Sequence, residues 1–252
     1  MQASVKIMDI DVDMISNDVF IDKINEYLTE ERLHVIFFAS TELLNQAVEE
    51  EEYRKLVDMA DLFLPGEEAL LSAHHADILK AGDMVVSCKN LGQVLENLKK
   101  EDRSLYIVAR SEEDAMLLKG YCEHMQPELK VVGFSACSDE VDDAAVVNDI
   151  NSHIPDMLLV ALDMGLQERW IMEHVSQLNA RLCIAIGGVA GIIIAQEKKT
   201  PVWVEKLHLA GIYHKLVREQ SVKKDVRARI FRKKVVQYNS QMKEQNQKGD
   251  RA

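Results

Sequence analysis

The sequence lacks the two features that mark a membrane-spanning or secreted chain. No apolar run approaches the roughly 20 residues that a spanning helix needs, and the longest candidate, residues 182–195, contains three glycines. Asp9, Asp11 and Asp13 lie where a signal peptide would carry a basic start and an uninterrupted apolar stretch. We therefore expect a cytoplasmic protein that does not cross a membrane.

Cysteine pairs and metal-ligand spacings are absent as well. Cys88, Cys122, Cys137 and Cys183 form no CxxC pair and have no histidine at metal-ligand spacing, which is typical of reduced thiols with structural roles. The one histidine cluster, His74–His75, has no partner residues, so we interpret it as a polar helix surface. The sequence predicts neither a bound metal nor a cofactor.

Charge is distributed unevenly along the chain. Residues 1–197 contain 15 Lys and Arg against 37 Asp and Glu, a formal net charge of −22. Residues 198–252 contain 15 against 5, a net charge of +10. An acidic body with a basic arm indicates that the arm meets an anionic partner, such as a phosphate, a nucleic acid or a lipid headgroup.

Short apolar runs alternate with longer helical patterns. This alternation predicts a Rossmann-like α/β fold, in which a parallel sheet carries helices on both faces. We expect the α/β domain at residues 1–205, a basic helical appendage at 206–240 and a disordered polar tail at 241–252. The expected strands are residues 35–38, 84–87, 105–108, 130–133, 157–161 and 183–186.

Two helices have recognisable patterns. Residues 41–61 place apolar side chains on one side and the acids of residues 49–52 on the other, as an amphipathic surface helix does. Ser111, followed by three acids, is expected to cap a helix that ends near Met125. In an open parallel sheet, ligands bind beyond the carboxyl ends of the strands. The loops expected to carry chemistry follow residues 38, 108, 133, 161 and 186.

One segment resembles a family signature. Residues 154–171, IPDMLLVALDMGLQERWI, are similar in order to the pattern PDIL-V-LG-P-QE-WI of the WecG/TagA/CpsF glycosyltransferases. Other segments resemble further parts of that family's pattern, so that the resemblance runs from about residue 33 to residue 232 and indicates a divergent member. These segments are residues 38–44, 59–67, 127–133, 186–188, 199–203 and 207–216.

The resemblance implies an activity. The family transfers an N-acetylhexosamine-type sugar, typically N-acetylmannosamine, from a UDP-sugar to an undecaprenyl-diphosphate-linked acceptor, with inversion at the anomeric carbon and without a metal. It implies that a UDP-sugar and a polyprenyl-diphosphate-linked acceptor are the substrates here, in the synthesis of a cell-surface polysaccharide such as teichoic acid. Which sugar moves, and whether the chain forms a homo-oligomer, is left open.

The family's catalytic base is replaced in this chain. The aspartate of the family's DG loop corresponds to Gly66-Glu67, so the resemblance makes Glu67 the candidate base. The alternative is an exposed acid at a helix start. Phe38 and Ser40 stand where the family has Thr and Asn. Ser40 or Thr41 either bonds a sugar or caps the following helix.

A second group of candidate residues follows the later strands. Gln167 and Glu168 retain the family's QE pair and are candidates for reading the uracil, the ribose or sugar hydroxyls; the alternative is that they open a helix. Gly187 and Gly188 would let backbone amides approach a diphosphate closely. Arg110 lies where an anion-binding cation would be useful, and its alternative is a solvated surface arginine.

Other replacements favour a second hypothesis. Asp163-Met164-Gly165 replaces the family's G-x-P, and Gly191 stands where the family has an aspartate. Together with Phe38 and the lost DG aspartate, these changes are typical of a catalytically impaired paralogue. Such a protein would bind a nucleotide or scaffold an assembly enzyme.

The basic arm interleaves cations with apolar residues. Such a helix can lie on an anionic membrane surface, where each basic residue contributes about 1 kcal/mol, and can balance the charge of a diphosphate. This predicts a peripheral location at the inner face of the cell membrane. The alternative is a helix that packs one face on the body; nucleic acid is disfavoured because the body is acidic and lacks an aromatic platform. The arginines expected to contact membrane or diphosphate are Arg218, Arg227, Arg229 and Arg232.

Overall fold

The computed structural model describes residues 3–67, 69–70, 90–138, 142–163, 165–194 and 200–249. The strand expected at residues 84–87, Cys88 and the pair His74–His75 lie outside these residues. Within the described part of the chain, the other three cysteines are buried and form no disulfide.

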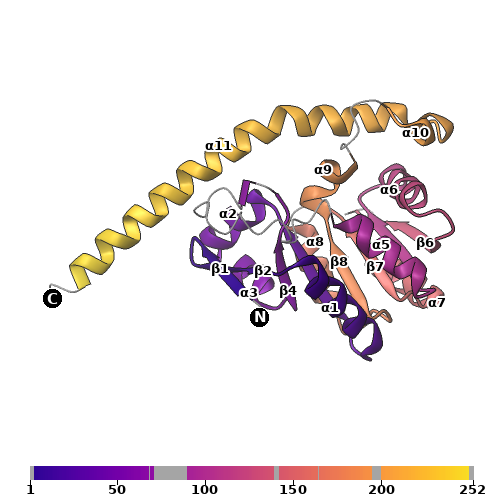
Figure 1. The fold of residues 1–252 in the computed structure, drawn as a ribbon, viewed down its shortest axis with the longest axis horizontal. Helices are drawn as coiled ribbons and strands as arrows, with labels where there is room; N and C mark the ends of the chain where they lie inside the picture. The colour runs from indigo at the N-terminus through magenta and orange to yellow at the C-terminus, as the bar shows by residue number, and fades with distance from the viewer. Residues whose placement is uncertain are drawn as a thin grey trace.

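The main sheet has six parallel strands in the order β4-β3-β8-β7-β5-β6, which confirms the expected α/β class (Figure 1). The strands are β3 (His34–Ala39), β4 (Leu62–Pro65), β5 (Ser104–Ala109), β6 (Lys130–Ala136), β7 (Met157–Ala161) and β8 (Leu182–Ala185). An antiparallel hairpin, β1 (Ala3–Ile7) and β2 (Ile10–Met14), is joined to β4 by the Asp13 carboxylate, which accepts a hydrogen bond from the Phe63 amide at 3.0 Å.

Helices cover both faces of the sheet, because successive strand residues point to opposite sides and both sides are apolar. The two sides of β7 show this, since Leu159 packs on one face and Leu158 on the other. Face 1 carries α1 (Asn17–Thr29), α5 (Leu91–Lys100), α6 (Glu112–Met125), α9 (Ala190–Ile194) and α10 (Val202–Lys206). Face 2 carries α2 (Thr41–Glu49), α3 (Glu51–Asp58), α7 (Asp143–His153), α8 (Leu166–His174) and the hairpin.

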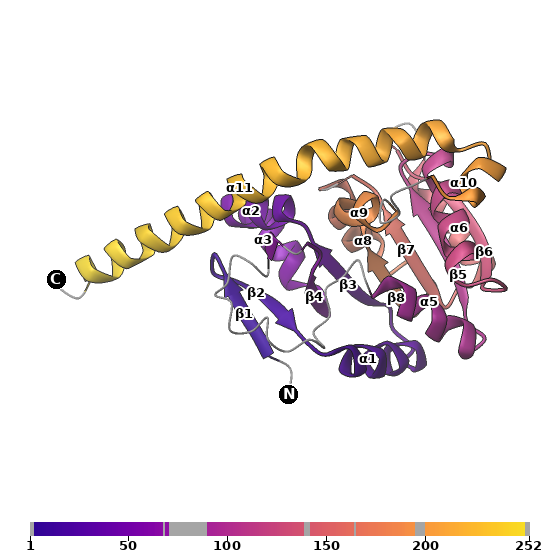
Figure 2. The same cartoon turned by 45° about the horizontal axis from the view of Figure 1, so that its top comes forward.

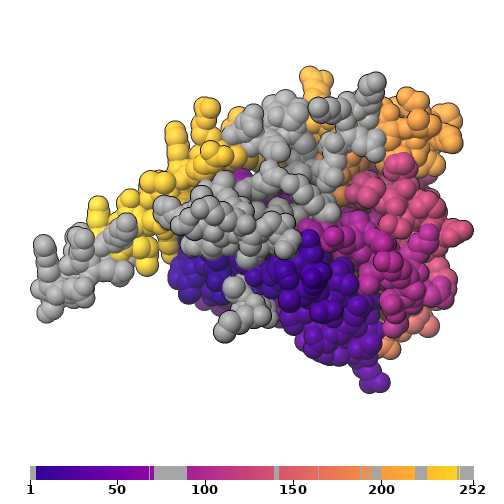
Figure 3. Space-filling view, in the orientation of Figure 1, coloured from indigo at the N-terminus to yellow at the C-terminus, as the bar shows by residue number. Residues whose placement is uncertain are grey.

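One 40-residue helix, α11 (Ala210–Gly249), crosses from face 1 to face 2 over the carboxyl-terminal edge of the sheet. Near its start Tyr213 is buried in the face 1 core, whereas Phe231 and Val235 are buried in the face 2 core. Figures 1 and 2 show the helix lying along the body, and in Figure 3 its yellow end extends past the body. Residues that are distant in the sheet order are therefore covered by one element.

The prediction of a single helix over residues 41–61 is wrong. α2 ends at Glu49 and α3 begins at Glu51, because Glu50 has an extended backbone with φ −127° and ψ 117°. Four consecutive glutamates lie at this point. Their mutual repulsion, and the unfavourable placement of acids at the carboxyl end of a helix, favour the break.

The carboxyl-terminal boundary also differs from expectation. α11 continues to Gly249, past residue 240, where we expected disorder to begin. The added residues are mainly Gln, Lys, Glu and Met, which have high helix propensity. Extending a helix that is already nucleated by packing requires no new nucleus.

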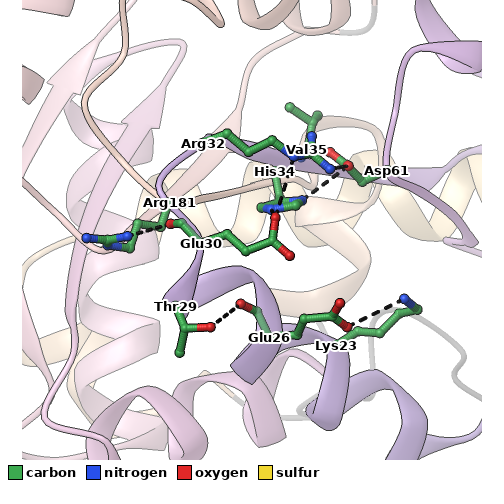
Figure 4. A network of polar contacts seen from close by, with 9 residues as sticks. All are labelled: Lys23, Glu26, Thr29, Glu30, Arg32, His34, Val35, Asp61 and Arg181. Atoms are coloured by element: carbon green, nitrogen blue, oxygen red, sulfur yellow. Dashed lines mark hydrogen bonds and ion pairs between the residues drawn. The ribbon is translucent and has the colours of Figure 1, made fainter.

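Aspartates that precede two strands pin the amino-terminal edge of the sheet. The Asp61 carboxylate, just before β4, accepts hydrogen bonds from the Val35 amide of β3 at 2.8 Å and from Arg32 at 2.5 Å. It also lies 3.2 Å from Nδ1 of the buried His34, whose Nε2 is 2.9 Å from Glu30 (Figure 4). One carboxylate thus ties two neighbouring strands together.

Asp156 plays the same part between β7 and β5. Its carboxylate accepts from the Ser104 amide at 2.8 Å and pairs with Arg103 at 2.9 Å. Burial would raise the pKa of Asp156, but these hydrogen bonds outweigh burial and lower it. Both aspartates belong to segments that resemble the family pattern. Each has a structural role there, because its carboxylate accepts a hydrogen bond from the backbone of the neighbouring strand.

We expect Asp61→Ala to lower the free energy of unfolding by about 2 to 4 kcal/mol, because it leaves the Val35 amide, Arg32 and His34 without their acceptor. Urea unfolding followed by circular dichroism measures the change. Asp58→Ala, at an exposed position of α3, is the matched control and should change stability by less than about 0.5 kcal/mol. Equal losses in the two variants would contradict this role of Asp61.

Candidate active site

A crevice is expected where the connections from two neighbouring strands leave toward opposite faces. β5 and β7 are neighbours, and the helix after β5, α6, covers face 1 whereas the helix after β7, α8, covers face 2. Such a point in a parallel sheet opens a ligand site at the carboxyl ends of the strands.

Two adjoining hollows lie at this point, an inner one of about 80 Å³ and an outer one of about 460 Å³. The first turns of α6, the ends of β7 and β8, α9 and the start of α11 form their walls. The inner hollow is lined by Arg110, Asp114, Leu117, Leu118, Ala161, Asp163, Gly187, Ala190, Gly191, Ile194 and Leu216. The outer hollow is lined by Arg110, Ser111, Glu113, Asp114, Asp163, Ile212, Lys215 and Leu216.

Arg110 lies in both hollows and is ion-paired to two carboxylates. Its Nη2 is 2.8 Å from Asp114, in the first turn of α6, and its Nη1 is 3.1 Å from Asp163, after β7. Burial would lower the pKa of Arg110, but the two carboxylates outweigh burial and raise it. The guanidinium is therefore a permanent cation at the crevice, and its binding of an anion stays a prediction.

Gln167 and Glu168 are buried and hold two turns together. The Gln167 side-chain oxygen accepts a hydrogen bond from the Gly187 amide at 2.7 Å, and its nitrogen donates to Glu168 at 3.0 Å. The Glu168 carboxylate accepts from the Gly165 amide at 2.7 Å at the start of α8. Burial raises the pKa of Glu168, against these hydrogen bonds. Gln167 and Glu168 lie in the first turn of α8, as the alternative interpretation of their sequence predicted. They also link this helix to the turn after β8.

Gly187 begins the 3-10 helix η3 (Gly187–Val189) at a point of close approach. A Cβ at this position would lie 1.9 Å from the carbonyl oxygen of Leu162 and 2.7 Å from the side-chain oxygen of Gln167. The glycine is required by this contact, and its amide is already engaged by Gln167. A phosphate at this turn would therefore rely on the following residue, Gly188.

Glu67 follows β4 and is buried, not the exposed helix-start acid that was its alternative interpretation. The Thr41 amide donates to its carboxylate at 2.9 Å and the Thr41 hydroxyl at 3.3 Å. Burial raises the pKa of Glu67, while the bonds from Thr41 and the positive charge of Arg227 act in the opposite sense. The result is a positioned carboxyl group with a pKa shifted toward neutrality.

Ser40, directly after β3, and Phe38, near the end of that strand, have structural contacts. The Ser40 hydroxyl accepts a hydrogen bond from the Leu43 amide at 3.1 Å and caps α2, as one of its two interpretations predicted. Phe38 is buried against Phe20, with ring centroids 6.3 Å apart. Thr41 is the residue of this loop that contacts a candidate catalytic group.

The inner side of α11 is tied to the body. Arg227 lies 3.3 Å from Glu42, and Lys234 lies 2.6 Å from Glu49, so both cations pair with α2. This confirms that one face of the arm packs on the body. The three other arginines expected to make contacts, Arg218, Arg229 and Arg232, have exposed side chains.

A model of the glycosyl transferase WecG/TagA/CpsF family matches residues 5–223. The chain belongs to this family. Two proteins named N-acetylglucosaminyldiphosphoundecaprenol N-acetyl-beta-D-mannosaminyltransferase are similar to it. That of Staphylococcus aureus (strain MRSA252) is 20% identical over 217 residues, which cover 85% of each chain. That of Bacillus subtilis (strain 168) is 20% identical over 198 residues, covering 77% of this chain and 76% of the relative.

The candidate residues of this WecG/TagA/CpsF family member lie along one edge of the sheet. In strand order, Glu67 follows β4, Thr41 follows β3, Gly187 follows β8, Gln167 follows β7 and Arg110 follows β5. Glu67 and Thr41 do not line either hollow described above. The edge therefore holds two separate groups, the Glu67 carboxylate after β4 and the Arg110 guanidinium after β5. The Gly187 turn after β8 lies between them in the strand order.

The candidate site residues from the sequence did not include four charged residues that line the outer hollow, Glu113, Asp114, Asp163 and Lys215. The spacing of Arg110 and Asp114, four residues apart at a helix start, is a signal that predicts their pairing. No comparable signal places Asp163 or Lys215. In the described residues, no group of three His, Cys, Asp or Glu side chains is arranged to hold a metal ion, and none of the helices is long and apolar enough to span a bilayer.

We expect Gly187→Ala to lower the thermal unfolding midpoint sharply or to prevent soluble expression, because the added methyl group meets a backbone carbonyl that cannot move aside cheaply. Gly211→Ala is the matched control, since a Cβ there meets nothing within 4 Å. Its midpoint should be unchanged or slightly higher. Thermal scans of the purified proteins measure both, and similar midpoints would contradict the assigned role of Gly187.

Proposed function

We propose that the protein transfers an N-acetylhexosamine-type sugar from a UDP-sugar to a polyprenyl-diphosphate-linked acceptor in the synthesis of a cell-surface polysaccharide. The names of the two relatives, which describe transfer of N-acetylmannosamine to a diphosphoundecaprenol-linked sugar, support this substrate class. The observation that carries the proposal is the buried Glu67 carboxyl group, held by Thr41 at the carboxyl edge of the sheet.

Glu67 is the proposed base. An inverting transfer needs a group that takes the proton of the acceptor hydroxyl, and such a group works best with a pKa near the working pH. Burial raises the pKa of Glu67 in this direction. The two hydrogen bonds from Thr41 orient the carboxylate. Glu67 thereby takes the place of the family's aspartate, with one more methylene in its side chain.

In the proposed reaction, which uses no metal, protein cations balance the negative charge of the diphosphate. The UDP leaving group develops negative charge, which fixed cations stabilise. Arg110 and Lys215 line the outer hollow and are the residues that we assign to the diphosphate, together with the backbone amide of Gly188. Gln167 and Glu168 contribute by holding the β7–α8 and β8–η3 turns in place.

The outer face of α11 is the proposed membrane contact, at the inner face of the cell membrane. Val226, Ile230 and Val236 are 57%, 50% and 66% exposed, on a helix whose opposite face packs on the body. Arg229 and Arg232 are exposed beside them. Apolar groups flanked by cations favour an anionic lipid surface, where the polyprenyl acceptor resides.

A second candidate function is a catalytically impaired paralogue that binds a nucleotide or scaffolds an assembly enzyme. The burial of Phe38 at a position that is polar in the family favours it, as does the internal pairing of Gln167 and Glu168. Calorimetric titration with UDP and the turnover assay below separate the two functions.

With a UDP-N-acetylhexosamine donor and a polyprenyl-diphosphate-linked N-acetylglucosamine acceptor, the purified protein should release UDP. Glu67→Gln should slow UDP release by at least about 100-fold, because general-base catalysis contributes this much. The control Glu112→Gln, at an exposed position of α6, should leave the rate of UDP release unchanged. The wild-type rate should fall on acidification through the raised pKa of Glu67, above the usual carboxyl range, since only the ionised form accepts a proton. Full activity of Glu67→Gln would remove Glu67 as the base, and no release by folded wild type would favour the second candidate.

Arg229→Gln should weaken partitioning onto phosphatidylglycerol vesicles about fivefold, because one cation at the surface is worth about 1 kcal/mol. The matched control is Arg169→Gln, which removes an exposed arginine from α8 on the body. Co-sedimentation with vesicles measures both. Equal binding of the two variants would mean that the outer face of α11 is not the contact.

A further inference from the structure

The Arg110–Asp163 ion pair belongs to the part of the lining that the two hollows of the crevice share. Arg110, Asp114, Asp163 and Leu216 line both of them. The inner hollow reaches Gly187 and Gly191, whereas the outer one opens beside Lys215 on α11. The pair joins the end of β5 to the loop after β7, so its two residues come from opposite walls of the crevice.

The two carboxylates on Arg110 are not equivalent. Asp114 is 17% exposed, is four residues away on the first turn of α6, and contacts the guanidinium at both Nε and Nη2. Asp163 is 71% exposed and makes a single contact of 3.1 Å with Nη1. Exposed single contacts of this kind contribute little free energy, so Asp163 is the partner that a competing anion can displace.

We propose that Asp163 is a displaceable latch on Arg110, and that a diphosphate group of a substrate takes its place on the guanidinium. Displacement makes Nη1 of Arg110 available to the diphosphate at the lining that the two hollows share. The inference rests on the proposed function for the identity of the anion. Asp163 thereby sets the affinity and specificity of the crevice for anions, a role that its position in the family pattern did not indicate.

The charges that line the outer hollow explain why the latch matters. Arg110 and Lys215 face the three acids Glu113, Asp114 and Asp163, so the lining carries a formal charge of −1. An arriving diphosphate is repelled as long as Asp163 occupies the cation. Once Asp163 swings into solvent, which its exposure allows, the remaining four charges balance and Nη1 is available to an oxygen of the diphosphate.

Asp163→Asn tests the latch. It should tighten binding of UDP and of inorganic pyrophosphate by about two- to fivefold, the range expected for removing an exposed competing ion pair. Asp9→Asn is the matched control, because it removes one exposed carboxylate from an arginine pair, Arg54–Asp9, on the hairpin side of the molecule. Isothermal titration of the full chain with each probe measures the affinities, and circular dichroism verifies the fold.

Arg110→Gln, alone and combined with Asp163→Asn, completes a double-mutant cycle. The gain from Asp163→Asn should vanish when Arg110 is absent, which a general effect of net charge would not produce. The latch is overturned if Asp163→Asn binds pyrophosphate no more tightly than wild type, if Asp9→Asn gains as much, or if the gain persists without Arg110. If Asp163→Asn binds pyrophosphate more tightly but the wild-type protein transfers no sugar, the latch stands and the proposed function fails. If the wild-type protein transfers sugar but Asp163→Asn binds pyrophosphate no more tightly, the proposed function stands and the latch fails.

Discussion

The buried carboxamide of Gln167 is the interaction on which the shape of the carboxyl edge depends. It joins the Gly187 amide after β8 to Glu168 at the start of α8, and Glu168 in turn holds the Gly165 amide. Each buried polar group in this set satisfies another, so removal of one member leaves the others unpaired at high cost. The walls of the inner hollow follow from these bonds, because both turns contribute to them.

The acidic body and the basic arm meet through one helix with two different sides. On the inner side, Arg227 and Lys234 of α11 pair with acids of α2, and Phe231 is buried beneath them. On the outer side, exposed apolar residues lie among exposed arginines. The same arm therefore packs on the body with one side and exposes apolar and basic side chains on the other, and the membrane contact stays a proposal for that exposed side.

Local patterns predicted the elements well where they were long and apolar. β5 and β7 lie where the apolar runs placed them, and the Ser111 cap starts α6 as expected, with its hydroxyl 3.1 Å from the Asp114 amide. β4 was not among the expected strands, because its four residues form a short run directly after the segment that was interpreted as one helix. The candidate residues lie along one edge, as the sequence predicted, because the carboxyl ends of parallel strands meet there. Their contacts were not predicted, since Thr41–Glu67 and Arg110–Asp163 join residues 26 and 53 positions apart.

The sequence by itself determined the α/β class, the family, the edge at which chemistry is expected and the separation of charge between body and arm. These properties depend on residue type, order and local spacing, which the chain carries before it folds. Only the tertiary structure decided that Glu67 is buried beside Thr41, that Gly187 must be a glycine and that Asp163 occupies Arg110. These depend on how closely distant segments approach when the sheet and α11 pack, and a packing distance of a few ångströms is not encoded in any local pattern.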